Sequence, residues 1–359
     1  METPVQSTTG NSLPDIDCVI IGVNTVMTLE RCLLSVKDSS YPSEKLHIVY
    51  VDGGSSDGSI AAAEAVADVA VVSLKDAHPT PGRGRNAGWH IASSPLVQFL
   101  DSDTVMEPDW LEQAVTAMAD EQVGAVMGYR KEMHPDRTVY NWITSLEWNG
   151  PPGEADSFGG DVLVRRQILE ETGGYDEVMV GGEDPELSQR VRQAGWKILQ
   201  LDAVMTYHDI AMTTAGQYWK RAYRSGYGFA AVIDKTAGQN QGFWRQEFRR
   251  ILVRGGGFLL LSLFALLCCL AGFLLHPLFF AVAAGSLLLG LVLLFFPRLF
   301  RVKSFMTTKG LTLEQARIYA LHCSCVILPD ILGVSRYYFG RFFNRPLRNN
   351  PSSLKSRKT

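Results

Sequence analysis

The chain has 359 residues, a net charge of −3 and 20% charged residues. This length leaves room for one large domain with additional segments, and the ordinary charge says little about any one region. Six cysteines lie scattered without the paired spacing of a zinc site, so we expect reduced thiols. Residues 1–15 are polar and have no apolar stretch, which predicts a flexible leader and excludes a signal peptide there.

The first two predicted strands each run into a polar turn. Residues 16–23 form an apolar, β-branched run followed by Asn24, and the run at 46–51 ends in the acidic, glycine-rich stretch DGGSSDGS. Glycine lets the backbone approach a ligand closely, and a carboxylate such as Asp52 can accept a base N–H or a ribose hydroxyl. Asp57 has an equally good structural explanation, because it precedes a helix predicted at 60–67 and could cap it.

A constrained loop with two prolines and three glycines follows the third predicted strand, 69–74. It brings Arg83 and Arg85 to a helix predicted at 86–92, where cations lie at the end that the helix dipole disfavours. A phosphate partner would remove this conflict, because helix N-termini and arginines both bind phosphate. Two solvated surface arginines explain the pattern equally well.

The next predicted strand, 96–100, ends in two carboxylates one residue apart, Asp101 and Asp103. Ligands of open α/β sheets bind beyond the carboxyl ends of strands, and two hard oxygen donors there suit Mg²⁺ or Mn²⁺ together with substrate phosphates. For an isolated Asp-x-Asp, a solvated turn in which Asp103 caps the helix starting near Pro108 is the simpler explanation. The motifs elsewhere in the chain favour the metal site.

The second half of this region adds an aromatic loop, a carboxylate and a histidine. Residues 130–153 are irregular and aromatic, which predicts an acceptor-site wall, membrane contact or a satellite core. Asp184 precedes Pro185, so we expect it to cap the following helix; as a general base it would need burial to raise the pKa that the helix dipole lowers. A strand from 197 leads toward His208, a candidate metal ligand, although a lone histidine is more often not one.

Two long uncharged runs predict a transmembrane hairpin. Residues 255–275 and 277–296 contain no charged side chain, and each run is long enough to cross a bilayer core of about 30 Å. Lysines and arginines flank both outer ends, so the positive-inside rule places both flanks in the cytoplasm. A buried hairpin of a soluble domain is the less favoured alternative.

The segments on either side of the hairpin are predicted to lie on the membrane surface. Residues 211–254 form an amphipathic or interfacial connector that could gate the site. Residues 316–334 are apolar but interrupted by Pro329 and Asp330, and crossing would put the basic end of the chain outside. We therefore expect an interfacial or re-entrant helix within a basic cytoplasmic tail, 297–359, and we disfavour a nucleic-acid-binding role because the tail adjoins two spans.

Taken in order, these motifs resemble those of family 2 glycosyltransferases with the GT-A fold. The resemblance covers about residues 16–231, in the stretches VIIGVN, VDGGSSDGS, RGRNAG, FLDSD, GGDVLVRRQILEETGGYDE and GGEDPELSQRVRQAGW. It implies an α/β domain at 16–210, a mixed sheet flanked by helices, followed by the membrane hairpin. It implies nucleotide or donor binding by Asn24, Asp52, Asp57, Arg85, Asp101 and Asp161, metal binding by Asp103 and His208, and a catalytic base at Asp184.

The resemblance also implies a reaction. We expect metal-dependent, inverting transfer of one sugar from a nucleotide sugar, a UDP-sugar by preference, to a lipid-linked acceptor at the cytoplasmic face of the inner membrane. The cofactor would be Mn²⁺ or Mg²⁺, and the product a surface polysaccharide or glycolipid. The absence of the Gln-x-x-Arg-Trp motif of processive synthases favours transfer of a single sugar. A polyprenyl-phosphate glycosyltransferase and a non-catalytic membrane scaffold remain as alternatives.

Overall fold

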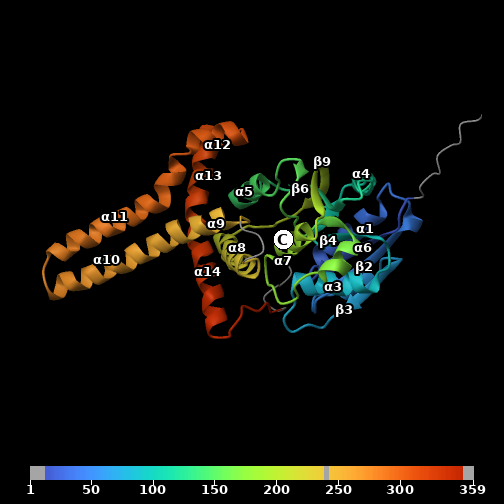
Figure 1. Ribbon diagram of the computed structural model, residues 1–359, viewed down its shortest axis with the longest axis horizontal. Helices are drawn as coiled ribbons and strands as arrows, with labels where there is room; N and C mark the ends of the chain where they lie inside the picture. Colours follow the sequence, from blue (N-terminus) through green and yellow to red (C-terminus); the bar gives the residue numbers. More distant parts are fainter. Residues whose placement is uncertain (1–12, 238–241, 351–359) are drawn as a thin grey trace, which may run out of the picture.

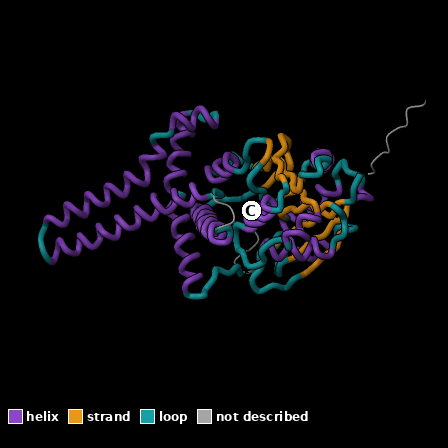
Figure 2. The backbone as a smooth tube through the Cα atoms, in the orientation of Figure 1, coloured by secondary structure: helices purple, strands orange, loops and turns teal. Residues whose placement is uncertain are grey.

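A mixed nine-stranded sheet lies at the centre of the N-terminal part of the protein (Figures 1 and 2). The computed structural model describes residues 13–237 and 242–350, so most of the predicted leader lies outside the described residues. The strands are β1 (Ile16–Gly22), β2 (Leu46–Asp52), β3 (Val69–Ser73), β4 (Leu96–Asp101), β5 (Thr104–Met106), β6 (Val123–Glu132), β7 (Gly153–Glu154), β8 (Val162–Arg165) and β9 (Lys197–His208).

The order of the strands separates a parallel half from a mixed half. The sheet runs β3-β2-β1-β4-β8-β6-β9-β5, with β7 paired to β9. The first four strands are parallel, while β8 is antiparallel to both of its neighbours, β4 and β6. The parallel strands therefore all end at one edge of the sheet, where Asp52 and Asp101 close β2 and β4.

Helices cover both faces of the sheet, and two apolar clusters fill the space between the layers. One cluster joins the sheet to α1 and α4, and the other joins it to α3, α6 and α7. The helices of this part are α1 (Val26–Lys37), α2 (Ser59–Glu64), α3 (Pro81–Ile91), α4 (Trp110–Ala117), α5 (Val139–Glu147), α6 (Arg166–Thr172) and α7 (Glu183–Gln193). The predicted α/β fold of this part is confirmed, and all six cysteines are free, as expected.

Several predicted boundaries were wrong. Helix α3 begins at Pro81, because Thr80 accepts a hydrogen bond from the backbone N–H of Arg83 and so caps it five residues earlier than expected. The cap of α7 is Gly182, in a left-handed conformation, so Asp184 lies inside the first turn and is not the cap. The supposedly irregular stretch 130–153 contains the end of β6 and the whole of α5, whose cap is Thr138.

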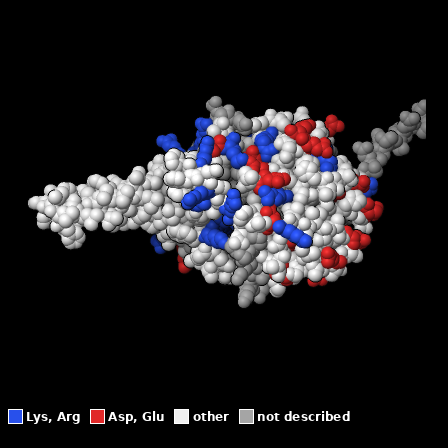
Figure 3. Space-filling view, turned by 90° about the horizontal axis from the view of Figure 1, so that it is seen from below, with Lys and Arg blue, Asp and Glu red and all other residues white. Residues whose placement is uncertain are grey.

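The C-terminal part is helical. Its elements are α8 (Ala215–Lys235), α9 (Arg245–Arg250), a π-helical turn (Ile251–Gly256), α10 (Gly257–Leu274), α11 (Leu278–Leu299), α12 (Val302–Lys309), α13 (Leu313–Cys325) and α14 (Ile327–Phe342). The hairpin α10–α11 projects away from the sheet, and α13 and α14 lie between it and the α/β part (Figure 1). On the face shown in Figure 3 the projecting hairpin carries no charged residue, while lysines and arginines gather on the body beside it.

Among residues 13–237 and 242–350, three helical stretches are long and apolar enough to cross a membrane, one more than the sequence predicted. In the apolar 18-residue segments of the stretches 245–274 and 278–309, 17% of the residues are buried within the protein, against 56% in that of 313–342. The third stretch is more buried because α14 packs along α8, where Gly226 and Gly333 leave no room for a side chain between the two backbones. An interfacial or re-entrant position for residues 316–334 stays a prediction.

Candidate active site

At the carboxyl edge of the parallel strands, three carboxylates lie around one arginine. Arg85 is only 2% exposed; its Nη2 lies 2.9 Å from Asp101, and its Nη1 lies 3.2 Å from Glu183 and 3.1 Å from Asp184. The solvated-surface explanation of Arg85 is therefore wrong, because its guanidinium is buried and pairs with three carboxylates. It applies better to Arg83, which is partly exposed and pairs with Asp76 at 2.5 Å.

The carboxylate of Asp161 holds the end of β4 through a hydrogen bond to its last residue, Asp101. It is buried, and it accepts hydrogen bonds from the backbone N–H of Asp101 (3.0 Å) and the hydroxyl of Thr206 (2.7 Å). Nη2 of Arg130 lies 2.9 Å from the Asp161 carboxylate, and this cation opposes the rise in the pKa of Asp161 that burial causes. Asp161 was predicted to lie near the sugar; in the structure it orients the residue that opens the Asp-x-Asp motif.

Asp103 and His208, the two predicted metal ligands, lie side by side, and metal binding by them stays a prediction. Nε2 of His208 lies 3.0 Å from Oδ1 of Asp103, because β5 pairs with β9 and brings Thr104 opposite His208. The ring of Trp148 packs edge-on against the imidazole. Asp103 does not cap α4, whose cap position is Asp109. A carboxylate oxygen and an imidazole nitrogen that face each other, with Asp101 nearby, fit a divalent cation that takes its remaining ligands from substrate phosphates.

The other predicted nucleotide ligands shape the loops around the cleft. Asp52 is fully buried, and it accepts the backbone N–H groups of Gly54 (2.9 Å) and Ser55 (2.8 Å). Asn24 accepts the N–H of Ser56 at 2.8 Å, and Asp57 accepts the N–H of Val26 at 3.2 Å. These bonds tie the turn after β1 to the turn after β2. Direct contact of these side chains with a nucleotide stays a prediction.

Two adjoining cavities meet at this edge. The first, about 360 Å³, is lined by the turns after β1 and β2 together with Asp103, Arg130 and His208. The second, about 770 Å³, is lined by Asp184 and by one face of α8. Asp101 lines both cavities, so a ligand that extends from the first into the second would pass the Asp-x-Asp motif before it reached Asp184.

As a general base, Asp184 would need burial to raise its pKa, and the structure places it in such an environment. Burial raises its pKa to about 8, helped by the neighbouring charges of Glu183 and Asp101 and opposed by Arg85. Burial thus outweighs the effect of the positive charge of Arg85, which lowers the pKa. A carboxylate with a raised pKa is a stronger base than an ordinary aspartate, and it is suited to accept a proton from a hydroxyl group near neutral pH.

Several residues at the site were missed by sequence reasoning. Arg130 was assigned to an irregular loop, although it ends in the carboxylate cluster, 3.7 Å from Asp101. Arg221 and Arg224 line both cavities from α8, beyond the predicted domain boundary at residue 210. The basic face of α8 was a usable signal for them. Asn349 lines the first cavity and donates to the carbonyl of Pro79 at 2.8 Å, and no local motif marks it.

A mixed sheet that ends in an Asp-x-Asp motif, beside a carboxylate at the start of a helix, defines a GT-A-type glycosyltransferase. The family model "Glycosyl transferase family 2" matches residues 17–171, and "Glycosyl transferase family group 2" matches residues 96–297, more than half of the chain. The chain therefore belongs to the family 2 glycosyltransferases and is a glycosyltransferase. The fold class and the enzyme class expected from the sequence are both confirmed.

The known relatives are distant in sequence, and their names agree with the assignment as a glycosyltransferase. Glycosyltransferase AglE of Haloferax volcanii is 24% identical over 226 residues, which cover 61% of this chain and 74% of that protein. Probable glycosyltransferase YdaM of Bacillus subtilis is 26% identical over 260 residues, 67% of this chain and 60% of that protein. The mannosyltransferase PcManGT of Pyrobaculum calidifontis, solved with GDP-Man and Mn²⁺, has a TM-score of 0.57 and 18% identity, covering 91% of this chain and 88% of that one. This last likeness shows the fold.

Proposed function

We propose that this chain transfers one sugar from a nucleotide sugar, a UDP-sugar by preference, to a lipid-linked acceptor in a metal-dependent, inverting reaction. The observation that carries the proposal is the convergence of Asp184, Arg85 and Asp101 in a cleft whose opposite wall is α8. That helix also packs on the membrane part, so the base and the membrane anchor share one wall. The names of the relatives and the GDP-Man and Mn²⁺ held by the structural neighbour support the donor class and the metal.

The chemistry follows from the placement of the charges. Asp184 would accept the proton of the acceptor hydroxyl as that oxygen attacks the anomeric carbon. Arg85 holds Asp184 in place and limits the rise in its pKa. A divalent cation held by Asp103 and His208 would supply positive charge to the departing diphosphate. Arg221 and Arg224, which line both cavities, would add further positive charge. One displacement with one base inverts the anomeric centre.

The membrane setting of the proposal rests on sequence and shape together. Basic residues flank the outer ends of the hairpin, which favours a cytoplasmic position for the catalytic part at the inner membrane. A cleft walled by α8, close to the apolar helices, suits an acceptor that stays in the bilayer. Surface polysaccharide or glycolipid synthesis is the process that needs such a transfer.

The test is an assay of purified full-length protein against a panel of UDP-, GDP- and TDP-sugars, with Mn²⁺, Mg²⁺ or EDTA. We expect turnover of one donor class, loss of turnover in EDTA, and a product with inverted anomeric configuration. Retained configuration would contradict the single displacement. Neither turnover nor nucleotide binding in folded protein would favour the scaffold alternative. Transfer to a bare polyprenyl phosphate would favour the alternative acceptor.

A further inference from the structure

A separate polar cavity lies where the membrane helices meet the catalytic part. It has a volume of about 300 Å³ and is bounded by α5, α8, α9, α11, α13 and α14. Its charged lining consists of Arg221, Arg250 and Arg298, with His322, Glu147 and Asp330. The cavity shares Met212, Arg221, Ser225 and Phe229 with the cleft of Asp184, so the two spaces adjoin along α8.

Arg250 and Arg298 come from the ends of the two hairpin helices that lie nearest the body of the protein. Arg250 closes α9, and Arg298 lies in the last turn of α11. The two cations are close enough to repel each other, and within residues 13–237 and 242–350 neither forms an ion pair. Nε of Arg250 is buried without a hydrogen-bond partner among these residues. Two clustered guanidinium groups without a carboxylate in ion-pair contact repel each other, and an anion between them would relieve this repulsion.

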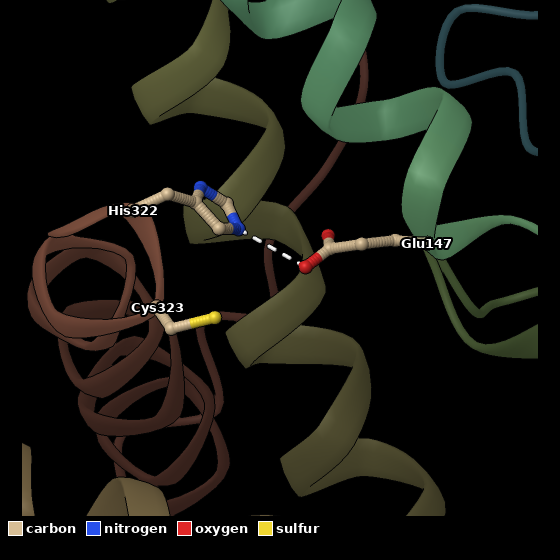
Figure 4. Close-up of side chains that lie close together, drawn as sticks. All are labelled: Glu147, His322 and Cys323. Carbon is tan, nitrogen blue, oxygen red and sulfur yellow. Dashed lines mark hydrogen bonds and ion pairs between the residues drawn. The ribbon is translucent and has the colours of Figure 1, made fainter. Parts of the chain in front are cut away.

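The carboxylates of the cavity do not supply that anion. Glu147 lies 3.1 Å from Nε2 of His322 and accepts the hydroxyl of Tyr319 at 3.0 Å (Figure 4). The other ring nitrogen of His322 is bonded to the hydroxyl of Tyr218 at 2.8 Å. Both nitrogens of His322 are therefore engaged, and this wall of the cavity forms a completed hydrogen-bond network. Cys323 lies beside the network (Figure 4).

Asp330 is the second carboxylate of the cavity. It is buried, and its charge attracts Arg250, but the two groups are not within ion-pair distance of 4.0 Å. Asp330 and Arg250 both line the cavity of about 300 Å³, so an anion that enters the cavity can reach Arg250. An anion between Arg250 and Arg298 would be close to the membrane boundary and also next to the cleft of Asp184.

We propose that this cavity binds the phosphate or diphosphate group of the lipid-linked acceptor, with Arg250 and Arg298 as its cationic contacts. Guanidinium groups match phosphate oxygens in geometry and charge. The lipid chain would leave along the apolar hairpin, and the group that receives the sugar would reach the adjoining cleft of Asp184. This inference rests on the proposed function, because it identifies where that acceptor is held.

The test uses full-length protein in phosphatidylcholine nanodiscs and measures binding of a radiolabelled polyprenyl diphosphate. Arg250→Gln and Arg298→Gln are each expected to weaken binding about tenfold, because each removes a charged hydrogen-bond donor. Arg249→Gln is the matched control, since Arg249 is an exposed arginine next to Arg250. Arg250→Lys and Arg298→Lys should recover part of the affinity.

Competition experiments show whether the cavity prefers the diphosphate of a polyprenyl lipid, the phosphate of an ordinary lipid headgroup or free phosphate. Unlabelled polyprenyl diphosphate should displace the probe, whereas the same molar amounts of phosphatidylglycerol or inorganic phosphate should not. Equal binding by the glutamine variants and the wild type would overturn the proposal, and equal competition by phosphatidylglycerol would reduce the cavity to a general anionic-lipid site. Nucleotide-sugar binding is measured in parallel and should be the same in all variants. If the wild type itself binds no nucleotide sugar, the proposed function fails whatever the lipid result.

Discussion

The arginines at the sheet edge and those at the base of the apolar helical hairpin lie in opposite electrostatic environments. Arg85 and Arg130 are surrounded by carboxylates, with Asp101 within 4 Å of both. Arg250 and Arg298 face each other's positive charge without an ion pair among the described residues. At the sheet edge the cations already pair with the carboxylates of the candidate site. Beside the apolar hairpin, neither arginine has an ion-pair partner among the described residues, which is the state expected of a site that receives an anion from outside.

This contrast predicts that the paired cations matter for folding and the unpaired ones for binding. Replacing Arg130 with Met leaves Asp161 without its cation, and we expect unfolding to become easier by about 3 kcal/mol, because a buried carboxylate loses its partner. Thermal unfolding in detergent measures the effect. Arg137→Met is the control: Arg137 pairs with Asp209 at 3.0 Å, but it is 38% exposed, so its loss should cost less than about 1 kcal/mol. Equal effects would show that Asp161 does not depend on Arg130.

The packing of α14 against α8, which joins the helical part to the candidate site, can be disrupted by a single substitution. A Cβ on Gly333 would approach the carbonyl oxygen of Tyr223 to 2.1 Å, so Gly333→Leu must push α14 away from α8. We expect a loss of about 1–3 kcal/mol, the range for overpacked interiors, together with weaker acceptor use because the shared wall moves. Gly285→Leu, on the exposed side of α11 with nothing within 4 Å, should leave the melting temperature unchanged. An unchanged melting temperature for Gly333→Leu would contradict the tight packing of the two helices.

The raised pKa of Asp184 predicts a pH profile. Because the base must be deprotonated, and its pKa is raised to about 8, kcat/KM should rise about tenfold per pH unit below that value and level off above it. Steady-state kinetics from about pH 6 to about pH 9, at saturating metal ion, measures this profile. A flat profile over this range would mean that Asp184 is not the titrating base, or that the donor and metal return its pKa to that of an ordinary aspartate.

Much of the α/β part could be predicted because its chemistry is local. Strands 16–23, 46–51 and 96–100 are short apolar runs that end in polar residues, and parallel strands bring such ends to one edge. From this rule alone, Asp101 and Asp103 are predicted to lie at the edge of the sheet. The rule did not reveal that Asp52 would be buried beneath its own turn, because the direction of a side chain depends on hydrogen bonds to later residues.

The rest depended on contacts distant in sequence. Arg85 lies next to Asp184 only because α3 and α7 pack on the same face of the sheet, a pairing that no local pattern carries. Likewise, residues 316–334 are predicted to lie at the membrane interface because Pro329 and Asp330 interrupt their apolar run. In the structure Gly226 packs against the backbone of Asp330, so the interruption lies at a helix crossing within the protein.

The proposed transfer reaction depends on Asp184 as its base. The decisive measurement is the transfer rate of Asp184→Asn beside wild type and Glu186→Gln, which changes a carboxylate of the same helix that pairs with Arg190. We predict that kcat of Asp184→Asn falls about 10³-fold, the contribution of a general base, while nucleotide-sugar binding is retained and Glu186→Gln keeps its rate. A transfer rate for Asp184→Asn close to that of the wild type would contradict the central claim that this carboxylate activates the acceptor.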